Sequence, residues 1–522
     1  MKHAEKTLPT APEELEELAL SLYKTLHKKE LEAASYKNEA ASYKSKYESL
    51  LEQIRLARQQ RFAPSSEKNP LQKDLFDEAG AEMPSHETSQ EKKRDNVDVA
   101  AHTRGKKPKR TQLPKDLPRE IIEYDIDEKH KICGCGQHLV RIGEEVTEQL
   151  KYIPAKLSVV CHVRPKYACK PCQENVKLAP IPVLLLPKSI ATPELVSHII
   201  ISKYCDHLPL YRQEKMWQRI AIDLPRSSLS SWILKTAELC APLIKLLQKN
   251  IVSHDYAQAD ETTVQVFGEK DRKNTSKSYM WCYRGGRDTP NIVYEYQETR
   301  SGFNAENFLH GFAGYLQTDA YAGYNWAQKD KQIDSVGCNA HARRNFAVLA
   351  KLSESPRLAK DGIKFYRKLY RIEAQARENK LTAAQRHKLR CEQSQPILAS
   401  FKQWLDKNLT KTPEKSQIGK AIRYAIRHWP QLTCFLKDGR IEIDNNLIEN
   451  AIRPFAIGRK NWLFMGSPSG AKAGAAFYSL IETCKANNIN PQKYLCTMLH
   501  KIRLCKCEDD YRKLLPQNIQ LD

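Results

Sequence analysis

Three acidic residues stand where predicted secondary structure could bring their carboxylates together. Asp260 lies within a predicted strand, Asp319 at the end of another, and Glu449 near the start of a predicted helix. Carboxylate oxygens are ligands that Mg²⁺ and Mn²⁺ prefer, and two such ions about 3.5–4 Å apart can activate a nucleophile and neutralise charge during phosphodiester cleavage. The pattern predicts a metal-dependent site that acts on a nucleic-acid backbone, with Glu261 and Asp444 as the nearest substitutes.

Four cysteines form a second set of residues with metal-ligand spacing. Cys169 and Cys172 form a Cys-x-x-Cys pair, whereas Cys133 and Cys135 are one residue closer together. Four thiolates can close a tetrahedral structural zinc site at about 2.3 Å per bond. The competing interpretation is a set of free buried thiols. If Cys133 is not a ligand, the replacements are His130, His138 or Cys161.

Basic side chains gather at three places, two of them close in sequence to the acids. One is the run 104–110, one follows the last predicted strand, and one lies beyond Glu449, where aromatic residues accompany the cations. Cations suit phosphate contact and aromatic rings suit base stacking. The competing interpretations are a solvated charge run and, for the aromatic residues 462–464, a core position. The predicted DNA-binding residues are Lys106, Lys107, Arg110, His341, Arg343, Arg344, Arg453, Arg459, Lys460 and Trp462.

The overall composition agrees with a nucleic-acid partner. The 522 residues include 84 Lys and Arg against 62 Asp and Glu, a net charge of +22, which attracts polyanions. No stretch approaches the ~20 apolar residues of a membrane span, and no signal peptide is visible, so we expect a cytoplasmic protein without a membrane partner. The 15 cysteines then indicate reduced thiols and metal ligands rather than disulfides.

The elements around the three acids predict a ribonuclease-H-like α/β catalytic domain over residues 251–475. Runs of β-branched and aromatic residues predict strands, and a helix is expected between the third and fourth of them. In such a sheet the first strand is central and the fourth lies beside it, so Asp260 and Asp319 meet at one edge. Long helical segments form an insertion at about 341–440. The predicted strands are 256–267, 278–283, 291–296, 314–319 and 333–338, and the helix is 304–310.

The remainder of the chain predicts a multidomain α+β protein. A heptad pattern over 13–62 favours a dimerising coiled coil, although Tyr and Ala fill its middle and a helix packed on its own domain is the alternative. A polar linker at 63–119, mostly disordered, and a zinc-finger module at 120–180 follow. Residues 186–250 are predicted to be helical and helix-turn-helix-like, with helices at 197–204, 211–220 and 227–239.

Several ordered motifs resemble transposases of the insertion sequence 66 family. The resemblance covers about residues 15–515. The first zinc pair departs from it, because the family has Cys-x-x-Cys where this chain has Cys133-Gly-Cys135. The matching motifs are Phe62-Ala-Pro-Ser-Ser-Glu67, Leu113-Pro-Lys-Asp-Leu-Pro-Arg-Glu120, Val163 to Cys172, Lys203 to Gln213, Asp260-Glu-Thr262, Asp319-Ala-Tyr-Ala-Gly-Tyr324, His341-Ala-Arg-Arg344 and Gly458-Arg-Lys-Asn-Trp-Leu-Phe464.

The resemblance implies a DDE transposase in which Asp260, Asp319 and Glu449 hold Mg²⁺ or Mn²⁺, and in which zinc is structural. It also implies a C-terminal transposase segment at about 476–515. The expected activity is cleavage at insertion-sequence ends and strand transfer into target DNA. Double-stranded DNA, a second copy of the chain and accessory proteins of the same element are the expected partners. The alternatives are a catalytically inactive zinc-containing DNA-binding protein and a nuclease of the same fold without strand transfer.

Overall fold

The computed structural model describes residues 11–62, 183–351 and 357–521, with 158–160, 162, 166–167 and 177–178 between them. The chain divides into one unit of Met1–Ser66 with Ile181–Asp522 and a second of Glu67–Pro180. In the second unit, β1 (Lys166–Tyr167) pairs antiparallel with β2 (Lys177–Leu178). The four predicted zinc cysteines, their three alternatives, the 63–119 linker, Lys106, Lys107 and Arg110 lie outside the described residues.

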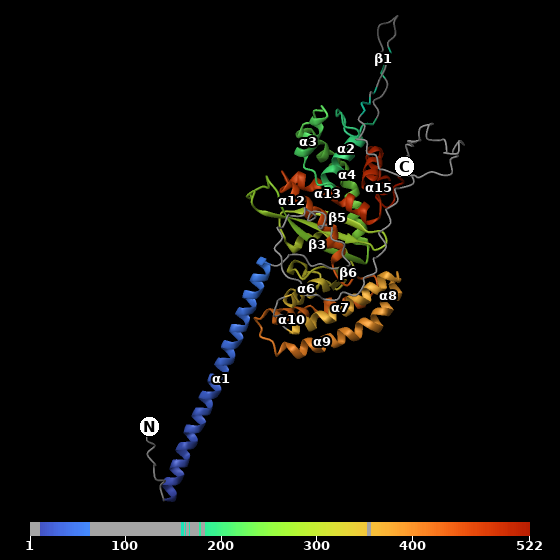
Figure 1. The fold of residues 1–522 in the computed structure, drawn as a ribbon. Coiled ribbons are helices and arrows are strands. Elements are labelled where there is room, and N and C mark those ends of the chain that lie inside the picture. The colour runs from blue at the N-terminus through green and yellow to red at the C-terminus, as the bar shows by residue number, and fades with distance from the viewer. Residues whose placement is uncertain are drawn as a thin grey trace, which may run out of the picture. The chain divides into compact units, whose positions relative to one another are not determined.

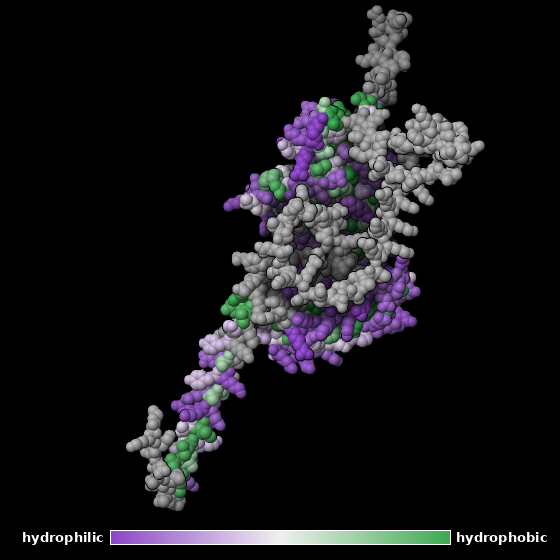
Figure 2. Space-filling model, viewed as in Figure 1, coloured by the Kyte–Doolittle hydropathy of each residue, from purple (hydrophilic) through white to green (hydrophobic). Residues whose placement is uncertain are grey.

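The N-terminal heptad segment is one continuous helix, α1 (Pro12–Phe62), which confirms the predicted helix. Apolar side chains along it are exposed: Leu22 and Leu26 each expose 60% of their surface and Tyr36 exposes 71%. They alternate with hydrophilic side chains along the helix (Figures 1 and 2). A helix that leaves leucines in water gains stability by packing them against a partner, so the coiled coil stays a prediction.

A five-stranded mixed sheet forms at the predicted positions, in the order β5-β4-β3-β6-β7 (Figure 1). The first three strands are antiparallel, whereas β3–β6 and β6–β7 are parallel, so β3 is central and β6 lies beside it as expected. Helix α5 (Gly302–Phe308) joins β5 to β6. The strands are β3 (Tyr256–Gln265), β4 (Lys277–Gly285), β5 (Asn291–Gln297), β6 (Gly314–Gln317) and β7 (Ile333–Val336).

The first hydrophobic core contains the sheet, helices that precede it in the sequence and helices that follow it. Helix α4 (Arg226–Ser253) and helix α13 (Pro468–Ala486) both pack against β5. The third helix of the 186–250 region was expected to end at 239, which is wrong, because α4 continues to Ser253. Apolar residues at helical spacing extend the buried face past Pro242 and hold this part of α4 on the sheet. They are Leu243, Leu246, Leu247 and Ile251.

Smaller helices complete this core. Helix α2 (Pro193–Tyr204) packs against α14 (Pro491–Lys501), and α3 (Leu210–Arg219) packs against α4. Helix α15 (Glu508–Lys513) follows near the C-terminus. The helical region, the sheet and the C-terminal segment therefore share one hydrophobic core. The exact domain boundaries that we expected remain predictions.

Helix α13 also covers the edge of the sheet. The backbone N–H of Tyr294 in β5 donates to Ser479 Oγ over 2.8 Å. Thr483 Oγ1 accepts from the N–H of Ile292 and donates to its carbonyl, both over 3.0 Å. These hydroxyls satisfy backbone groups that an edge strand would otherwise expose for pairing with another chain.

The predicted helical insertion between β7 and the last acid has a hydrophobic core of its own. Phe346, Tyr366 and Phe401 are buried at its centre. Its surface carries mostly hydrophilic side chains (Figure 2). The chain then returns to the sheet as α12 (Asn446–Trp462), which contacts β3 and β4. The insertion helices are α6 (Asn339–Ala350), α7 (Arg357–Glu378), α8 (Ala383–Leu389), α9 (Gln395–Leu409), α10 (Gln417–Arg427) and α11 (Trp429–Thr433).

None of the helices in the described ranges combines the length and the apolar character needed to cross a membrane.

Candidate active site

The register of the sheet places two of the predicted acids level with each other. Gln258 of β3 pairs with Gln317 of the parallel strand β6. Asp260 follows two residues later within β3, and Asp319 lies two residues beyond the end of β6, so both acids leave the last paired position at the same distance along the chain. Asp260 Oδ1 accepts the N–H of Glu261 over 2.8 Å, and Asp319 Oδ1 accepts the N–H of Tyr321 over 2.9 Å.

Glu449 reaches the same place from the first turn of α12. Ile448 and Ile452 bury the adjacent face of the helix, and α12 contacts β3 along its length. Burial raises the pKa of Asp260 to about 8, with the charge of Glu261 and then those of Asp319 and Glu449 adding to the effect. Carboxylates that oppose each other's ionisation in this way are an environment that a divalent cation relieves. The residues present therefore fit a metal site.

The nearest substitutes, Glu261 and Asp444, have structural partners instead. Glu261 forms an ion pair with Arg300 over 2.6 Å and accepts the hydroxyl of Tyr324 over 2.7 Å. Asp444 accepts the hydroxyl of Tyr370 over 2.8 Å, and its two oxygens also accept from the backbone and side-chain nitrogens of the following Asn446. Both carboxylates therefore already have protein partners, although burial raises the pKa of each.

A buried polar network that the sequence analysis missed holds the three acid-bearing segments together. Gln317 Oε1 accepts from the hydroxyl of Tyr256 over 2.6 Å and from Gln258 Nε2 over 2.8 Å. Gln317 Nε2 donates to the carbonyl of Glu442 over 2.9 Å, in the segment that leads into α12. The signal was present in the sequence, because both strands carry Gln-x-Asp at the critical position. These residues position the acids rather than replace them.

The predicted His-Ala-Arg-Arg motif begins α6 and lies against the acidic centre. His341 Nδ1 is 3.6 Å from Glu449 Oε1. Arg343 stacks over the ring of Tyr370 at 5.8 Å, and Arg344 is exposed. The buried Cys338 Sγ accepts the N–H of Asn445 over 3.2 Å, and burial raises the pKa of this thiol to about 12. The structure thus brings His341 close to Glu449, places Arg343 over Tyr370 and leaves Arg344 facing solvent.

The basic and aromatic segment at the end of α12 differs from expectation in which residues are exposed. Arg459 donates to the hydroxyls of Thr262 and Thr263 on β3. Trp462 is partly buried and packs edge-on against Phe455 at 5.4 Å.

Beyond Trp462 the chain turns outward. Leu463 has a positive φ of 64° and is 65% exposed, and Phe464 is 42% exposed and stacks on Phe267 at 4.1 Å. Arg453 is half-buried, and Lys460 is exposed. Leu463 and Phe464 are therefore the accessible apolar side chains of this segment, whereas Trp462 supports the core.

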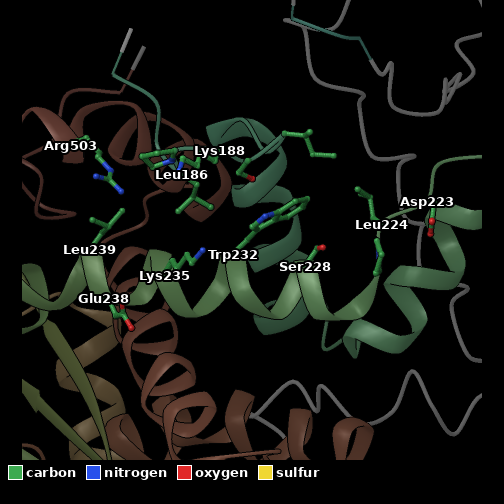
Figure 3. A pocket seen from close by; sticks show the side chains of 14 residues that line it. Leu186, Lys188, Asp223, Leu224, Ser228, Trp232, Lys235, Glu238, Leu239 and Arg503 are labelled. Atoms are coloured by element: carbon green, nitrogen blue, oxygen red, sulfur yellow. The ribbon is translucent and has the colours of Figure 1, made fainter. Parts of the chain in front are cut away.

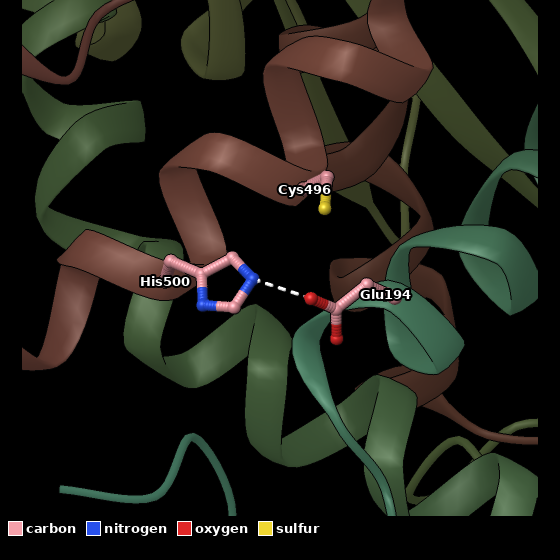
Figure 4. A group of neighbouring side chains, drawn as sticks. All are labelled: Glu194, Cys496 and His500. Atoms are coloured by element: carbon pink, nitrogen blue, oxygen red, sulfur yellow. Dashed lines mark hydrogen bonds and ion pairs between the residues drawn. The ribbon is translucent and has the colours of Figure 1, made fainter. Parts of the chain in front are cut away.

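Two other features of the described residues lie outside the acidic centre. A groove of about 530 Å³ lies between residues 186–190, Arg503 and the face of α4 that carries Trp232 and Lys235 (Figure 3). Glu194 Oε1 of α2 and His500 Nε2 of α14 form a hydrogen bond over 2.7 Å, and Cys496 lies one turn earlier on α14 (Figure 4). The groove is open and of mixed charge, and the pair ties two helices together. Neither includes any of the three acids.

Comparison with known proteins places this arrangement in a family. The model "Transposase IS66 family" matches residues 188–473, and "zinc-finger binding domain of transposase IS66" matches 130–173. "Transposase C of IS166 homeodomain" matches 49–122, and "IS66 C-terminal element" matches 479–517. The chain belongs to the IS66 transposase family. The predicted resemblance is thereby confirmed, and this IS66-family transposase is a DNA-processing enzyme with DNA as its partner and a zinc-binding module.

Relatives of similar length occur in Sinorhizobium fredii (strain NBRC 101917 / NGR234). The uncharacterized protein y4qI is 34% identical over 80% of this chain and 80% of its own length. The uncharacterized protein y4hP is 31% identical over 87% of this chain and 81% of its own length. The family matches of this IS66-family transposase cover the sheet, the insertion and the C-terminal helices. The assignment of its chemistry depends on the geometry described above.

Proposed function

We propose that this chain is a DDE transposase that cleaves DNA strands at insertion-sequence ends and transfers them into target DNA, with Asp260, Asp319 and Glu449 as metal ligands. The observation that carries the proposal is the placement of Asp260 on β3 and of Asp319 two residues beyond the end of the adjacent parallel strand β6, with Glu449 delivered beside them by α12. The raised pKa of Asp260 supports it, because crowded carboxylates suit divalent cations.

The strand order supports a ribonuclease-H-like assignment for the domain. Three antiparallel strands lead through a helix to two parallel strands, and the parallel junction between β3 and β6 carries both aspartates. Carboxyl ends of neighbouring parallel strands meet at one edge of a sheet, which is where ligands of α/β proteins gather. In the sequence, the helical insertion lies between this edge and the third acid, Glu449. In the structure, α12 brings Glu449 back to the sheet.

Bound Mg²⁺ or Mn²⁺ would supply Lewis-acid stabilisation of the phosphorane and a lowered pKa for the attacking water or 3′-hydroxyl. The chain's own residues do the rest. The three carboxylates hold the cations, and Tyr256, Gln258 and Gln317 fix the backbone that carries them. Exposed cations, among them Arg344 and Lys460, contact phosphates and set the register of the duplex. The zinc module and helices α2–α4 recognise terminal repeats, and α1 pairs two subunits.

Strand cleavage on a DNA duplex carrying the element's terminal repeat tests the proposal. In Mg²⁺, Asp319→Asn is expected to lose at least about 10³-fold in cleavage rate, because a neutral amide is a poor cation ligand, while DNA binding is kept. Asp288→Asn is the matched control, since Asp288 is an exposed acid in the turn between β4 and β5. Equal cleavage by Asp319→Asn and wild type contradicts the proposal.

Two further outcomes separate the rivals. DNA binding without cleavage by the wild-type chain indicates an inactive DNA-binding protein. Cleavage without joining of the 3′ end to a second duplex indicates a nuclease of the same fold.

A further inference from the structure

His341 and Glu449 face each other across a gap that a hydrogen bond does not bridge. Nδ1 of the imidazole lies 3.6 Å from Oε1 of the carboxylate. Both atoms are buried, and among the described residues neither has a hydrogen-bond partner. A charged imidazole–carboxylate pair would close to about 2.8 Å. Two ligands that share one cation at bonds of about 2.1 Å stand about 3.0–3.5 Å apart. The observed separation of 3.6 Å is close to the spacing of two ligands that share one cation.

The gap is built into the fold. Asn339, two residues before His341, donates from its side chain to the carbonyls of Leu432 and Ile443 over 2.9 and 3.1 Å. Cys338 Sγ receives the N–H of Asn445, which immediately precedes α12. The start of α6 is thereby fastened to the segment that delivers Glu449.

Outside these two buried atoms, both side chains are partly exposed. His341 and Glu449 expose 28% and 25% of their side-chain surfaces. Their ligand atoms and the sulfur of Cys338 all lie within 4.8 Å of one another. The sulfur already accepts a backbone hydrogen bond, so we assign Cys338 a positioning role and the ligand role to the imidazole.

We infer that His341 supplies a nitrogen ligand to the divalent cation held by Glu449, so that this site binds Mn²⁺ in preference to Mg²⁺. The inference rests on the proposed function, because it concerns the same acidic centre. Mg²⁺ selects oxygen ligands, whereas imidazole suits transition metals. A site of carboxylates alone would lack this preference. His341 thereby changes from an expected DNA contact to a metal ligand.

Pulsed electron paramagnetic resonance of Mn²⁺ on the full zinc-loaded chain tests the inference directly. Wild type is expected to show ¹⁴N coupling to bound Mn²⁺, and His341→Ala is expected to lose it and to bind Mn²⁺ at least about 10-fold more weakly. Its Mg²⁺ affinity, measured by competition, is expected to change less than about 3-fold. His310→Ala, which removes an exposed histidine near α5, controls for stray coordination.

Other results of these measurements would overturn the inference. Absence of ¹⁴N coupling in wild type, or coupling and affinity unchanged in His341→Ala, overturns the inference. Glu449→Gln is expected to abolish the ¹⁴N signal too, and a signal that persists there also overturns it. These measurements do not depend on cleavage. If the inference fails but Asp319→Asn is still inactive in cleavage, the proposed function stands. If Asp319→Asn cleaves DNA normally, the proposed function alone fails.

Discussion

Asp260 and Glu261 are consecutive acids on one strand, and their surroundings give them different roles. Glu261 forms an ion pair with Arg300 and accepts the hydroxyl of Tyr324, while burial raises the pKa of its carboxyl. Asp260 points to the opposite face, where the nearby charges are carboxylates and its pKa rises to about 8. Residue type and sequence position are nearly the same for both acids. The two acids therefore differ in their partners, because Glu261 pairs with a cation and the charges that act on Asp260 are carboxylates.

Glu295 on β5 makes a prediction about pH. Burial raises its pKa from an ordinary 4.5 to about 7. The folded state thus keeps a proton that the unfolded state has released, and the stability contributed by this group is lost as pH rises from about 4.5 through 7. Glu295→Gln should be more stable than wild type at pH 8, by up to ~3 kcal/mol, and equal to it near pH 4.5. Urea unfolding at both pH values measures this difference.

Glu298→Gln provides the control, because Glu298 lies three residues further on and is exposed. It should leave stability unchanged at both pH values. A stabilisation by Glu295→Gln of the same size at pH 4.5 and pH 8 would show that packing, rather than ionisation, is responsible.

Phe464 makes a prediction about DNA affinity. The ring is 42% exposed beside the strained, exposed Leu463, at the end of a helix that starts at the acidic centre. Stacking of an exposed ring on a base is worth about 1–3 kcal/mol. Phe464→Ala should weaken binding of terminal-repeat DNA by about 5- to 150-fold in fluorescence anisotropy. Phe303→Ala, which truncates a ring that is 69% exposed on α5, should change affinity less than twofold. Equal losses in both variants would argue against a specific contact.

At the scale of elements, a buried ionic network ties the insertion to the segment that leads into α12. Arg386 pairs with Glu373 over 2.6 Å and with Glu442 over 2.7 Å. Arg390 is fully buried, pairs with Glu373 over 2.8 Å and donates to backbone carbonyls between 435 and 441. The backbone carbonyl of Glu442 also accepts a hydrogen bond from the side-chain amide of Gln317. The insertion therefore holds the segment that leads into α12 and Glu449.

Arg390→Met tests this role. Removing one partner leaves Glu373 with less compensation for its buried charge and three carbonyls without a donor, which should lower the free energy of unfolding by about 3–5 kcal/mol. Strand cleavage should fall as well, because the backbone ahead of Glu449 loses its anchor. Chemical unfolding and the cleavage assay measure the two effects. Lys388→Met, on the exposed face nearby, should change neither. Full stability in Arg390→Met would contradict the network's role.

The sequence predicted this level of organisation unevenly, for physical reasons. The five strands were placed within a few residues, because alternation and turn residues are local signals. The predicted end of α4 was wrong, because packing on the sheet stabilises the helix past Pro242, where local propensity alone would end it. Arg390 and Glu373 are 17 residues apart and look like solvated helix residues, so only the fold reveals their burial. Trp462 was expected at the DNA surface, but it packs on Phe455, two turns earlier on α12, and is partly buried against the core.

At the scale of the whole molecule, the proposed strand transfer would bring two DNA ends to a chain with a net charge of +22. Transfer of both ends into one target would need two acidic centres held together, and the described residues of one chain supply the centre formed by Asp260, Asp319 and Glu449. Helix α1 is the described element with the longest row of exposed apolar side chains, from Leu15 to Ile54. Pairing of two such helices would bury that row and join two catalytic units.

The seam of α1 can be tested with substitutions of one type on one helix. Leu22 and Leu26 lie on the heptad seam, whereas Leu20 and Leu31 lie off it, and all four are similarly exposed, at 58–61%. The double variant Leu22→Ser/Leu26→Ser should raise the dimer dissociation constant at least ~100-fold, since each buried leucine contributes about 1.5–3 kcal/mol. The double variant Leu20→Ser/Leu31→Ser should remain dimeric, because its side chains face water in either state. Light scattering after size exclusion measures the mass of each. A monomeric wild type, or equal dissociation of both variants, would mean that the heptad pattern does not define the interface and that paired cleavage requires another contact between subunits.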